Sequence, residues 1–169
     1  EYLGLDPKFG NWRDTHLRID GPATVALQIS FVEDWYLATD EYIRDLDWKP
    51  TKEASGDNAV LIEPTVTADL LDTATLMFLH AINTAKERIW IASPYFVPDD
   101  AIVAALQLAG LRGVDVRILI PDKPDHLLVF LAAFTYFEDA SLTGVRFFRY
   151  TDGFLHQKVM LIDNVGAAV

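Results

Sequence analysis

Cysteine is absent from this chain of 169 residues, which excludes a disulfide framework, a zinc site with thiolate ligands and a cysteine nucleophile. Long hydrophobic runs are absent too. The longest uncharged apolar stretch, residues 127–137, has 11 residues, whereas a helix that spans a bilayer needs about 20. We therefore expect no transmembrane helix. The chain starts at Glu1 without a basic segment, so we expect no signal peptide.

Basic residues are scarce relative to acidic ones. The chain has 14 Lys and Arg against 25 Asp and Glu, which gives a formal net charge of −11. A field of this sign opposes nonspecific binding to nucleic acid and docking on an anionic membrane surface. Apolar residues make up 51% of the chain, which is enough for a globular core. The sequence stops at Val169 within an apolar stretch, and we interpret it as a piece of a longer protein.

The first third of the chain has its own pattern. An alternating segment predicts a short strand over residues 17–20, and Gly21-Pro22 then opens a helix. Apolar residues spaced about four apart predict one buried face on this helix, made of Ala23, Leu27, Phe31 and Trp35. Residues 49–58 are polar and rich in turn formers, which indicates a linker or surface loop.

From residue 59 onward, short apolar strands alternate with helical stripes. The pattern predicts strands over residues 59–62, 89–92, 114–120, 145–150 and 158–162, and helices over residues 70–85, 98–109 and 126–142. This order predicts the α/β class: a layered, mixed, mainly parallel sheet flanked by helices, with parallel early strands. We divide the chain into a first part, residues 1–58, and a domain formed by residues 59–169.

The residues most informative about chemistry are His156 and Lys158. They stand two apart at the start of a predicted strand, so both side chains leave on one face, about 6.6 Å apart along it. An ammonium can hold the nonbridging oxygens of a phosphate ester, while an imidazole attacks phosphorus or moves a proton. The alternative is a chance pairing on a solvated strand face. We favour the catalytic interpretation because the pair follows a glycine-containing turn and opens an apolar strand.

Asp163 completes the spacing His-x-Lys-x-x-x-x-Asp but lies seven residues from His156, with the opposite strand parity. An extended strand would separate the two by about 23 Å. We therefore expect Asp163 to have a structural role, and we expect the carboxylate that orients His156 to come from elsewhere.

Other candidates are weaker. Tyr95 follows a predicted strand at the edge where α/β sheets bind ligands, so it lines a substrate pocket or packs on a helix. Residues 127–137 form a helix that is buried in the core or contacts lipid. His16, His80 and His126 belong to no motif, and we assign them no chemistry.

The His156–Asp163 spacing resembles the signature of the phospholipase D superfamily, and the chain is most similar to its bacterial cardiolipin synthase branch. The resemblance covers nearly the whole chain. It also rests on residues 2–4, 12–22, 93–99, 112–121 and 152–155.

The resemblance implies that the whole protein carries two copies of the signature, one per half, which meet at one phosphate. Residues 1–58 would then end the first half, and residues 59–169 would form the second domain, truncated after its motif. A Gly-x-x-Asn element would follow Asp163. The partner is then the other half of the same chain, or a second copy in a homodimer, and the isolated piece is expected to be inactive.

The resemblance further implies a phosphatidyl transfer through a phosphohistidine, without a metal or other cofactor. The first-motif histidine would be the nucleophile, His156 the acid and base, and Lys158 a phosphate ligand. The donor would be a phospholipid such as phosphatidylglycerol, and the acceptor the glycerol hydroxyl of a second one. Segments outside this piece would attach the enzyme to the bacterial cell membrane, with its catalytic domain on the cytoplasmic side. A phospholipase D-like phosphodiesterase or nuclease and a noncatalytic interaction domain are the alternatives, and the charge of −11 counts against nucleic acid as a partner.

Overall fold

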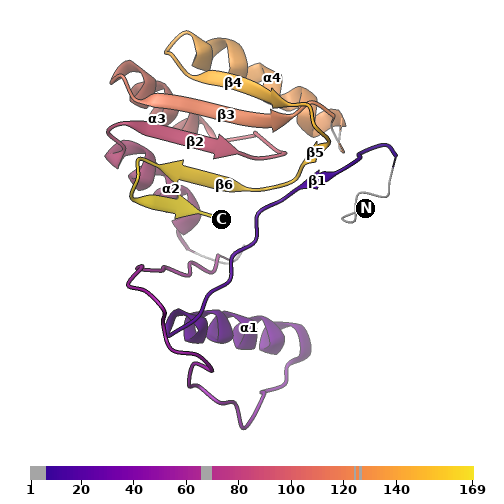
Figure 1. The fold of residues 1–169 in the computed structure, drawn as a ribbon, viewed down its shortest axis with the longest axis vertical. Coiled ribbons are helices and arrows are strands. Elements are labelled where there is room, and N and C mark those ends of the chain that lie inside the picture. Colours follow the sequence, from indigo (N-terminus) through magenta and orange to yellow (C-terminus); the bar gives the residue numbers. More distant parts are fainter. Residues whose placement is uncertain (1–6, 66–69, 124, 126) are drawn as a thin grey trace. The chain divides into compact units, whose positions relative to one another are not determined.

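The structure is a computed structural model that describes residues 7–65, 70–123, 125 and 127–169 (Figure 1). It divides into two compact units. One comprises the residues up to His16 together with Thr73–Val169, and the other comprises Leu17–Asp72. The predicted assignment of residues 1–58 and 59–169 to two halves of a larger protein stays a prediction.

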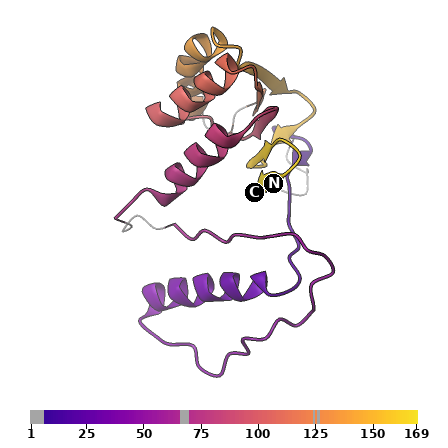
Figure 2. The ribbon, with the colours of Figure 1, turned by 90° about the vertical axis from the view of Figure 1, so that its left-hand side faces the viewer.

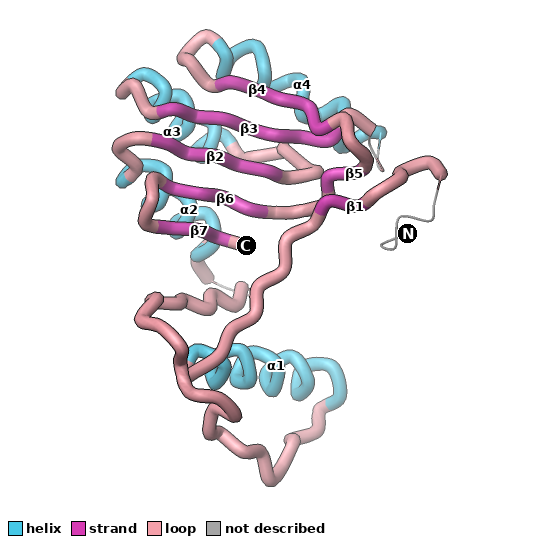
Figure 3. Tube along the Cα trace, in the orientation of Figure 1, coloured by secondary structure: helices cyan, strands magenta, loops and turns pink. Residues whose placement is uncertain are grey.

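A five-stranded mixed sheet forms the centre of the first unit, in the order β4-β3-β2-β6-β7 (Figure 3). Strands β2 (Arg88–Ala92), β3 (Asp115–Pro121) and β4 (Arg146–Tyr150) run parallel to one another. Strands β6 (Val159–Ile162) and β7 (Gly166–Ala168) each run antiparallel to their neighbour. The α/β class and the parallel early strands are therefore confirmed.

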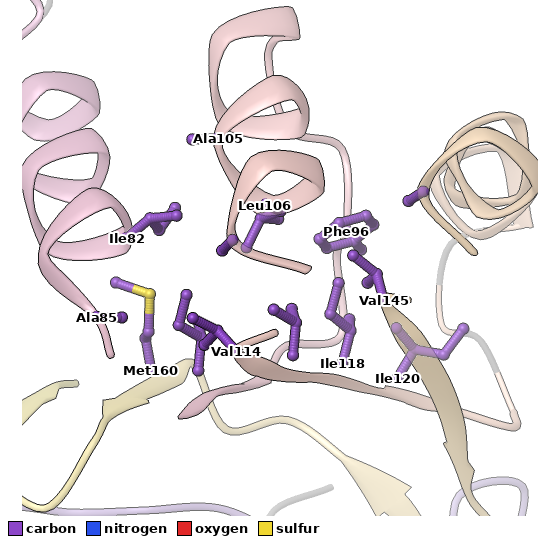
Figure 4. Packing of buried hydrophobic residues seen from close by; sticks show 14 of the residues in the cluster. Ile82, Ala85, Phe96, Ala105, Leu106, Val114, Ile118, Ile120, Val145 and Met160 are labelled. Atoms are coloured by element: carbon purple, nitrogen blue, oxygen red, sulfur yellow. The ribbon is translucent and has the colours of Figure 1, made fainter. Parts of the chain in front are cut away.

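Three helices, α2 (Thr73–Thr84), α3 (Asp100–Leu111) and α4 (Leu127–Ser141), cover one face of this sheet (Figure 2). Alternate residues of β3 face them and are almost fully buried, as the two-residue period of a strand requires. Figure 4 shows how these side chains meet the helices. The buried cluster includes Ile82, Ile89, Leu106, Val116, Ile118, Ile120, Val145 and Met160.

Local sequence signals explain the helix ends. The Asp99 side chain accepts a hydrogen bond from the Ile102 amide at 2.8 Å and caps α3. Gly113, just past the end of α3, has a φ of +86°, a conformation that favours glycine. Helix α2 begins at Thr73, three residues later than the first predicted apolar position, and Leu70 and Leu71 are exposed.

The alternatives for residues 127–137 are resolved in part by α4. Phe130, Ala133 and Phe137 belong to the core or pack against it, whereas Leu128 and Leu131 are exposed. One side of the helix is therefore a core face. Within the described ranges, no helix combines the length and hydrophobicity needed to cross a membrane.

Two predicted strands are wrong. Residues 17–20 and 59–62 form neither strand nor helix. Leu17, Val60 and Leu61 are exposed, and no described strand pairs with either segment, so their backbone groups have no ladder to join. The pairing that the pattern missed is β1 (Trp12–Arg13) with β5 (Phe154–Leu155), a short parallel pair between the two ends of the unit.

The second unit contains helix α1 (Ala23–Thr39), which starts after Pro22 as predicted. It ends at Asp40, where the chain turns left-handed with a φ of +56° and the Asp40 amide donates to the Tyr36 carbonyl at 2.8 Å. The predicted buried face is wrong, because Leu27, Phe31 and Trp35 are 43%, 58% and 40% exposed. Spacing identified the helix, but burial also needs a surface to pack on. Residues 49–58 form an exposed loop, as predicted.

Candidate active site

His156 and Lys158 lie just before β6, at the edge of the sheet where β2 ends. Because β6 runs antiparallel to β2, Val159 pairs with Ala92, and the residues before β6 stand beside the carboxyl end of β2. Lys158 Nζ lies 2.9 Å from His156 Nε2 and donates to the His156 carbonyl at 2.8 Å. The two side chains that the sequence singled out therefore come together.

The carboxylate that orients the imidazole is Asp14. Its Oδ2 lies 2.9 Å from His156 Nδ1, although the two residues are 142 positions apart. The β1–β5 pair brings them together: Trp12 is aligned with Phe154, Arg13 is aligned with Leu155, and the His156 amide donates to the Arg13 carbonyl at 2.9 Å. The expectation that this carboxylate lies outside the motif is met, and it lies within the chain itself.

Sequence reasoning gave Asp14 no role, although it stands in the family-like stretch over residues 12–22. The local sequence offered one signal: Asp14 is an acidic residue two positions after Trp12, which could start a strand. No local spacing connects that position with residue 156. The connection is a long-range strand pair, which a pattern within a short window does not reveal.

Gly153 allows the two segments to approach. Its φ is +102°, and a Cβ at this position would collide with the backbone carbonyl of Asn11. The Phe154 amide donates to that same carbonyl at 2.8 Å. A glycine is thus required where β5 meets β1, because a Cβ would push away the Asn11 backbone that leads into β1.

The electrostatics of the pair determine the tautomer of His156. Partial burial opposes the ionisation of Asp14, but hydrogen bonds from the His156 ring and the Thr15 amide outweigh it and lower the pKa of this carboxyl below its usual value. An ionised carboxylate only accepts hydrogen bonds, and an ammonium only donates them. His156 Nδ1 therefore carries the proton, and the lone pair of Nε2 faces Lys158 (2.9 Å).

Aromatic side chains pack against the imidazole of His156. The ring centroids of Trp12 and His156 are 4.8 Å apart, and Trp12 lies edge-to-face on Phe154 at 4.8 Å. Phe154 is fully buried, and Phe9 packs on it at 5.0 Å. This packing restricts the rotation of the ring and leaves His156 about one fifth exposed (21%).

Asp163 lies at the opposite end of β6. Its φ is +50°, and its carboxylate accepts hydrogen bonds from the backbone amides of Lys86, Glu87 and Arg88 at 2.8–3.3 Å. These backbone bonds, that of Arg88 first, lower the pKa of Asp163. The Asp163 carboxylate thus binds the segment that leads from α2 into β2, and it does not contact the His156 imidazole.

Tyr95 lies in the loop after β2 and is 37% exposed. Lys158 Nζ stands 5.8 Å from the centre of its ring. The Tyr95 hydroxyl donates to the carboxylate of Asp125, a residue that sequence reasoning did not select. Tyr95 therefore lies beside the His156–Lys158 pair and not in the core.

His16 and His80 are exposed, and His126 lies outside the described residues. The charge of His16 contributes to the lowered pKa of Asp14, after the hydrogen bonds from His156 and Thr15. Across the described ranges, no three side chains of the metal-binding types gather at one point.

The sequence matches the family described as "Cardiolipin synthase, PLD-like domain" over residues 78–169. It is 50% identical to a protein of Pseudomonas putida strain GB-1 and 48% identical to one of Pseudomonas syringae, both named cardiolipin synthase A. Each match covers 100% of this chain and 35% of the relative, so the chain spans about a third of their length. Among solved structures, a phospholipase D family member, Nuc from Salmonella typhimurium, is 31% identical over 54% of this chain and 58% of that chain, with a TM-score of 0.41.

Proposed function

Since this chain belongs to the phospholipase D-like domain family of cardiolipin synthases, we propose that it supplies one half of a site that transfers phosphatidyl groups between phospholipids. One observation carries the proposal: the row Asp14–His156–Lys158, in which each neighbouring pair of side chains is 2.9 Å apart. An oriented imidazole next to an ammonium is equipped for chemistry on a phosphodiester.

The proposed reaction has two steps. In the first, a histidine Nε2 forms a bond to phosphorus while the bond to the headgroup oxygen breaks, and a second histidine, which has taken up a proton on Nε2 from solvent, gives that proton to the leaving alkoxide. In the second, the hydroxyl oxygen of the acceptor attacks phosphorus, its proton passes to the second histidine, and the N–P bond breaks. Atoms and protons balance over the cycle, and both histidines return to their starting state.

In this scheme His156 is the acid and base, and the nucleophile comes from the other half of the site. Asp14 holds the His156 proton on Nδ1, which leaves Nε2 able to take and return a proton. Asp14 also stabilises the imidazolium that forms when His156 holds the extra proton. Lys158 binds the nonbridging phosphate oxygens and stabilises the charge that develops on them. Asp163 completes the motif as the residue that anchors the far end of β6.

Substrates and partners follow from the family. We propose a phosphatidylglycerol-like donor, a glycerol hydroxyl as acceptor, and a position at the bacterial cell membrane that depends on segments other than this one. The second histidine and lysine would come from the other half of the same chain or from a second copy. This piece contributes one such pair, so by itself it is expected to be inactive.

The test uses the full-length protein with phosphatidylglycerol vesicles and measures cardiolipin formation. His156→Ala and Lys158→Ala are expected to lower kcat by about 10²–10⁴-fold. His80→Ala, which removes an exposed histidine on α2, is the matched control. Wild-type protein that cleaves single-stranded DNA but forms no cardiolipin would replace the proposal with a nuclease, and full activity of His156→Ala would exclude this site.

A further inference from the structure

Two loops meet beside Lys158 at the carboxyl edge of the sheet. Tyr95 follows β2 and Asp125 follows β3, and these strands are parallel neighbours, so their carboxyl ends lie at the same edge. The Tyr95 hydroxyl donates to the Asp125 carboxylate and joins the two loops, and the Ser93 amide extends the β2–β3 ladder by donating to the Leu119 carbonyl at 3.1 Å. Ligands of open α/β sheets bind at this edge.

The backbone of Tyr95 is held in place by Ser93. The Tyr95 amide donates to Ser93 Oγ at 3.2 Å, and Ser93 Oγ donates to the Tyr95 carbonyl at 3.0 Å. The ring therefore has a defined position, with the ammonium of Lys158 over its face (5.8 Å) and the carboxylate of Asp125 at its hydroxyl. A ligand whose phosphate lies on Lys158 can therefore extend along the Tyr95 ring and reach a hydrogen-bond acceptor, the Asp125 carboxylate.

The charges at the two ends of this arrangement differ. Lys158 attracts a phosphate, whereas Asp125 repels a second phosphate and offers oxygen lone pairs to donors. A cationic headgroup could also approach a carboxylate, but the ammonium of Lys158 already stands over one face of the Tyr95 ring and would repel it. The donor that fits beside an existing cation is an uncharged hydroxyl.

We propose that Tyr95 and Asp125 form a subsite for the free hydroxyl groups of a polyol headgroup whose phosphate lies on Lys158. The inference rests on the proposed transferase function and specifies what selects the substrate. The Asp125 carboxylate accepts from a headgroup hydroxyl, and the Tyr95 phenol, which already donates to Asp125, holds the carboxylate in position. Such a site discriminates against headgroups without the hydroxyl, because its polar groups would then lack their partner.

The experiment measures kcat/KM for phosphatidyl release by the full-length protein from phosphatidylglycerol, phosphatidylethanolamine and phosphatidylethanol, whose headgroup has no free hydroxyl. Wild-type protein is expected to prefer phosphatidylglycerol over phosphatidylethanol by about tenfold or more. Asp125→Asn and Tyr95→Phe are expected to remove most of this preference by slowing phosphatidylglycerol alone. Asp125→Glu, which keeps the carboxylate, should retain part of it.

Asp122→Asn is the matched control. It removes the same charge from the same loop, but Asp122 pairs with Arg149 (3.5 Å) and not with Tyr95, so the preference should stay at the wild-type value. Thermal melting of every variant checks the fold, and Tyr95→Phe, which keeps the ring, tests the subsite even if Asp125→Asn unfolds.

Three results would overturn the inference. The first is an equal loss of kcat/KM on phosphatidylglycerol and on phosphatidylethanol in Asp125→Asn and Tyr95→Phe. The second is a preference for phosphatidylglycerol over phosphatidylethanol that stays unchanged in both variants. The third is a wild-type preference for phosphatidylethanolamine, which would identify a site for a cationic headgroup. Wild-type protein that cleaves none of the three lipids would contradict the proposed function itself, and the inference with it.

Discussion

The two ends of β6 carry the two ends of the same motif, and they are built differently. At its start, His156 is part-buried and Lys158 is exposed, and the His156 ring contacts both the Lys158 ammonium and the Asp14 carboxylate. At its end, Asp163 binds backbone amides of residues 86–88. In the proposed function the first end presents groups to a ligand, whereas the other end fastens the strand to the chain that leads into β2.

This contrast teaches that a spacing motif can combine chemistry and architecture in one segment. The four-residue strand between Lys158 and Asp163 separates the two roles physically. A carboxylate at the far end supports the position of the strand, so it acts on His156 only through the fold. The carboxylate that acts directly has to come from another segment, and the β1–β5 pair supplies it.

The largest expected effect is a loss of kcat on mutation of Asp14, which mutation of Asp163 should not cause. Asp14→Asn removes the ionised acceptor and allows the wrong tautomer of His156, so kcat for transfer should fall by about 10²–10⁴-fold while the melting temperature changes little. The measurement is cardiolipin formation by the full-length protein, with thermal melting in parallel. Activity near the wild-type value would show that Asp14 does not orient the imidazole.

The reverse result is expected at the other end of the strand. Asp163→Ala leaves the three amides of residues 86–88 without their acceptor, so the melting temperature should fall by several degrees. The protein that remains folded should keep a kcat close to wild type. If kcat falls as far as in Asp14→Asn with an unchanged melting temperature, Asp163 acts in catalysis and the contrast between the ends is wrong.

Acid should lower the stability of the fold at the end of the sheet where β3 begins, opposite His156 and Lys158. Asp115 starts β3 there, and hydrogen bonds from Arg117, and also from Arg146 and Trp90, lower its pKa to about 2. A lowered pKa stabilises the fold at pH values above about 4, and this contribution is lost as the pH falls from about 4 to 2.

Asp115→Asn is therefore expected to cost on the order of 1 kcal/mol of unfolding free energy at pH 7, a value reduced by solvent screening. The difference from wild type should shrink toward pH 2. Urea unfolding followed at pH 7, 4 and 2.5 measures it. A difference that is constant with pH would show that the carboxylate contributes by packing and not by charge.

The smallest expected effect lies at the catalytic end. Thr15 Oγ1 hydrogen bonds to Gln157 Oε1 at 3.1 Å, while the Thr15 amide, not its hydroxyl, donates to Asp14. Thr15→Val keeps the amide and the shape of the side chain, so it should lower the unfolding free energy by only about 0.5–1.5 kcal/mol. Its kcat should stay far closer to wild type than that of Asp14→Asn. An equally large loss of kcat would mean that the hydroxyl itself positions the site.

Much of the fold could be predicted from periodicity because its elements are local. The central strands β2 and β3, the edge strand β4 and the helix α3 were predicted from apolar patterns, and α3 also has clear boundary signals in Asp99 and Gly113. The segments 17–20 and 59–62 had a similar pattern over four residues but no partner strand in the described chain. A short alternation indicates that a strand is possible, and only a neighbour makes it one.

The site was predictable to the same extent. His156 and Lys158 are two residues apart, so strand geometry alone predicted that they share a face. Parity also predicted that Asp163 does not orient His156, and the structure places Asp163 just past the far end of β6, with a φ of +50°. Asp14 and Asp125 could not be found, because each joins the site through contacts across 142 and 30 residues, respectively. Such contacts depend on which strands become neighbours, and single-segment patterns do not contain that information.

The parallel pair of β1 with β5 has a practical consequence for anyone who cuts this gene into pieces. A clone that begins at Ala59 would still encode the whole five-stranded sheet, His156, Lys158 and Asp163, and any screen for the motif would score it as intact. It would nevertheless lack Asp14, Phe9 and Trp12, so the imidazole would lose the carboxylate and the aromatic packing that orient it. A clone meant to keep this imidazole oriented therefore has to include residues 9–14, which the motif itself gives no reason to retain.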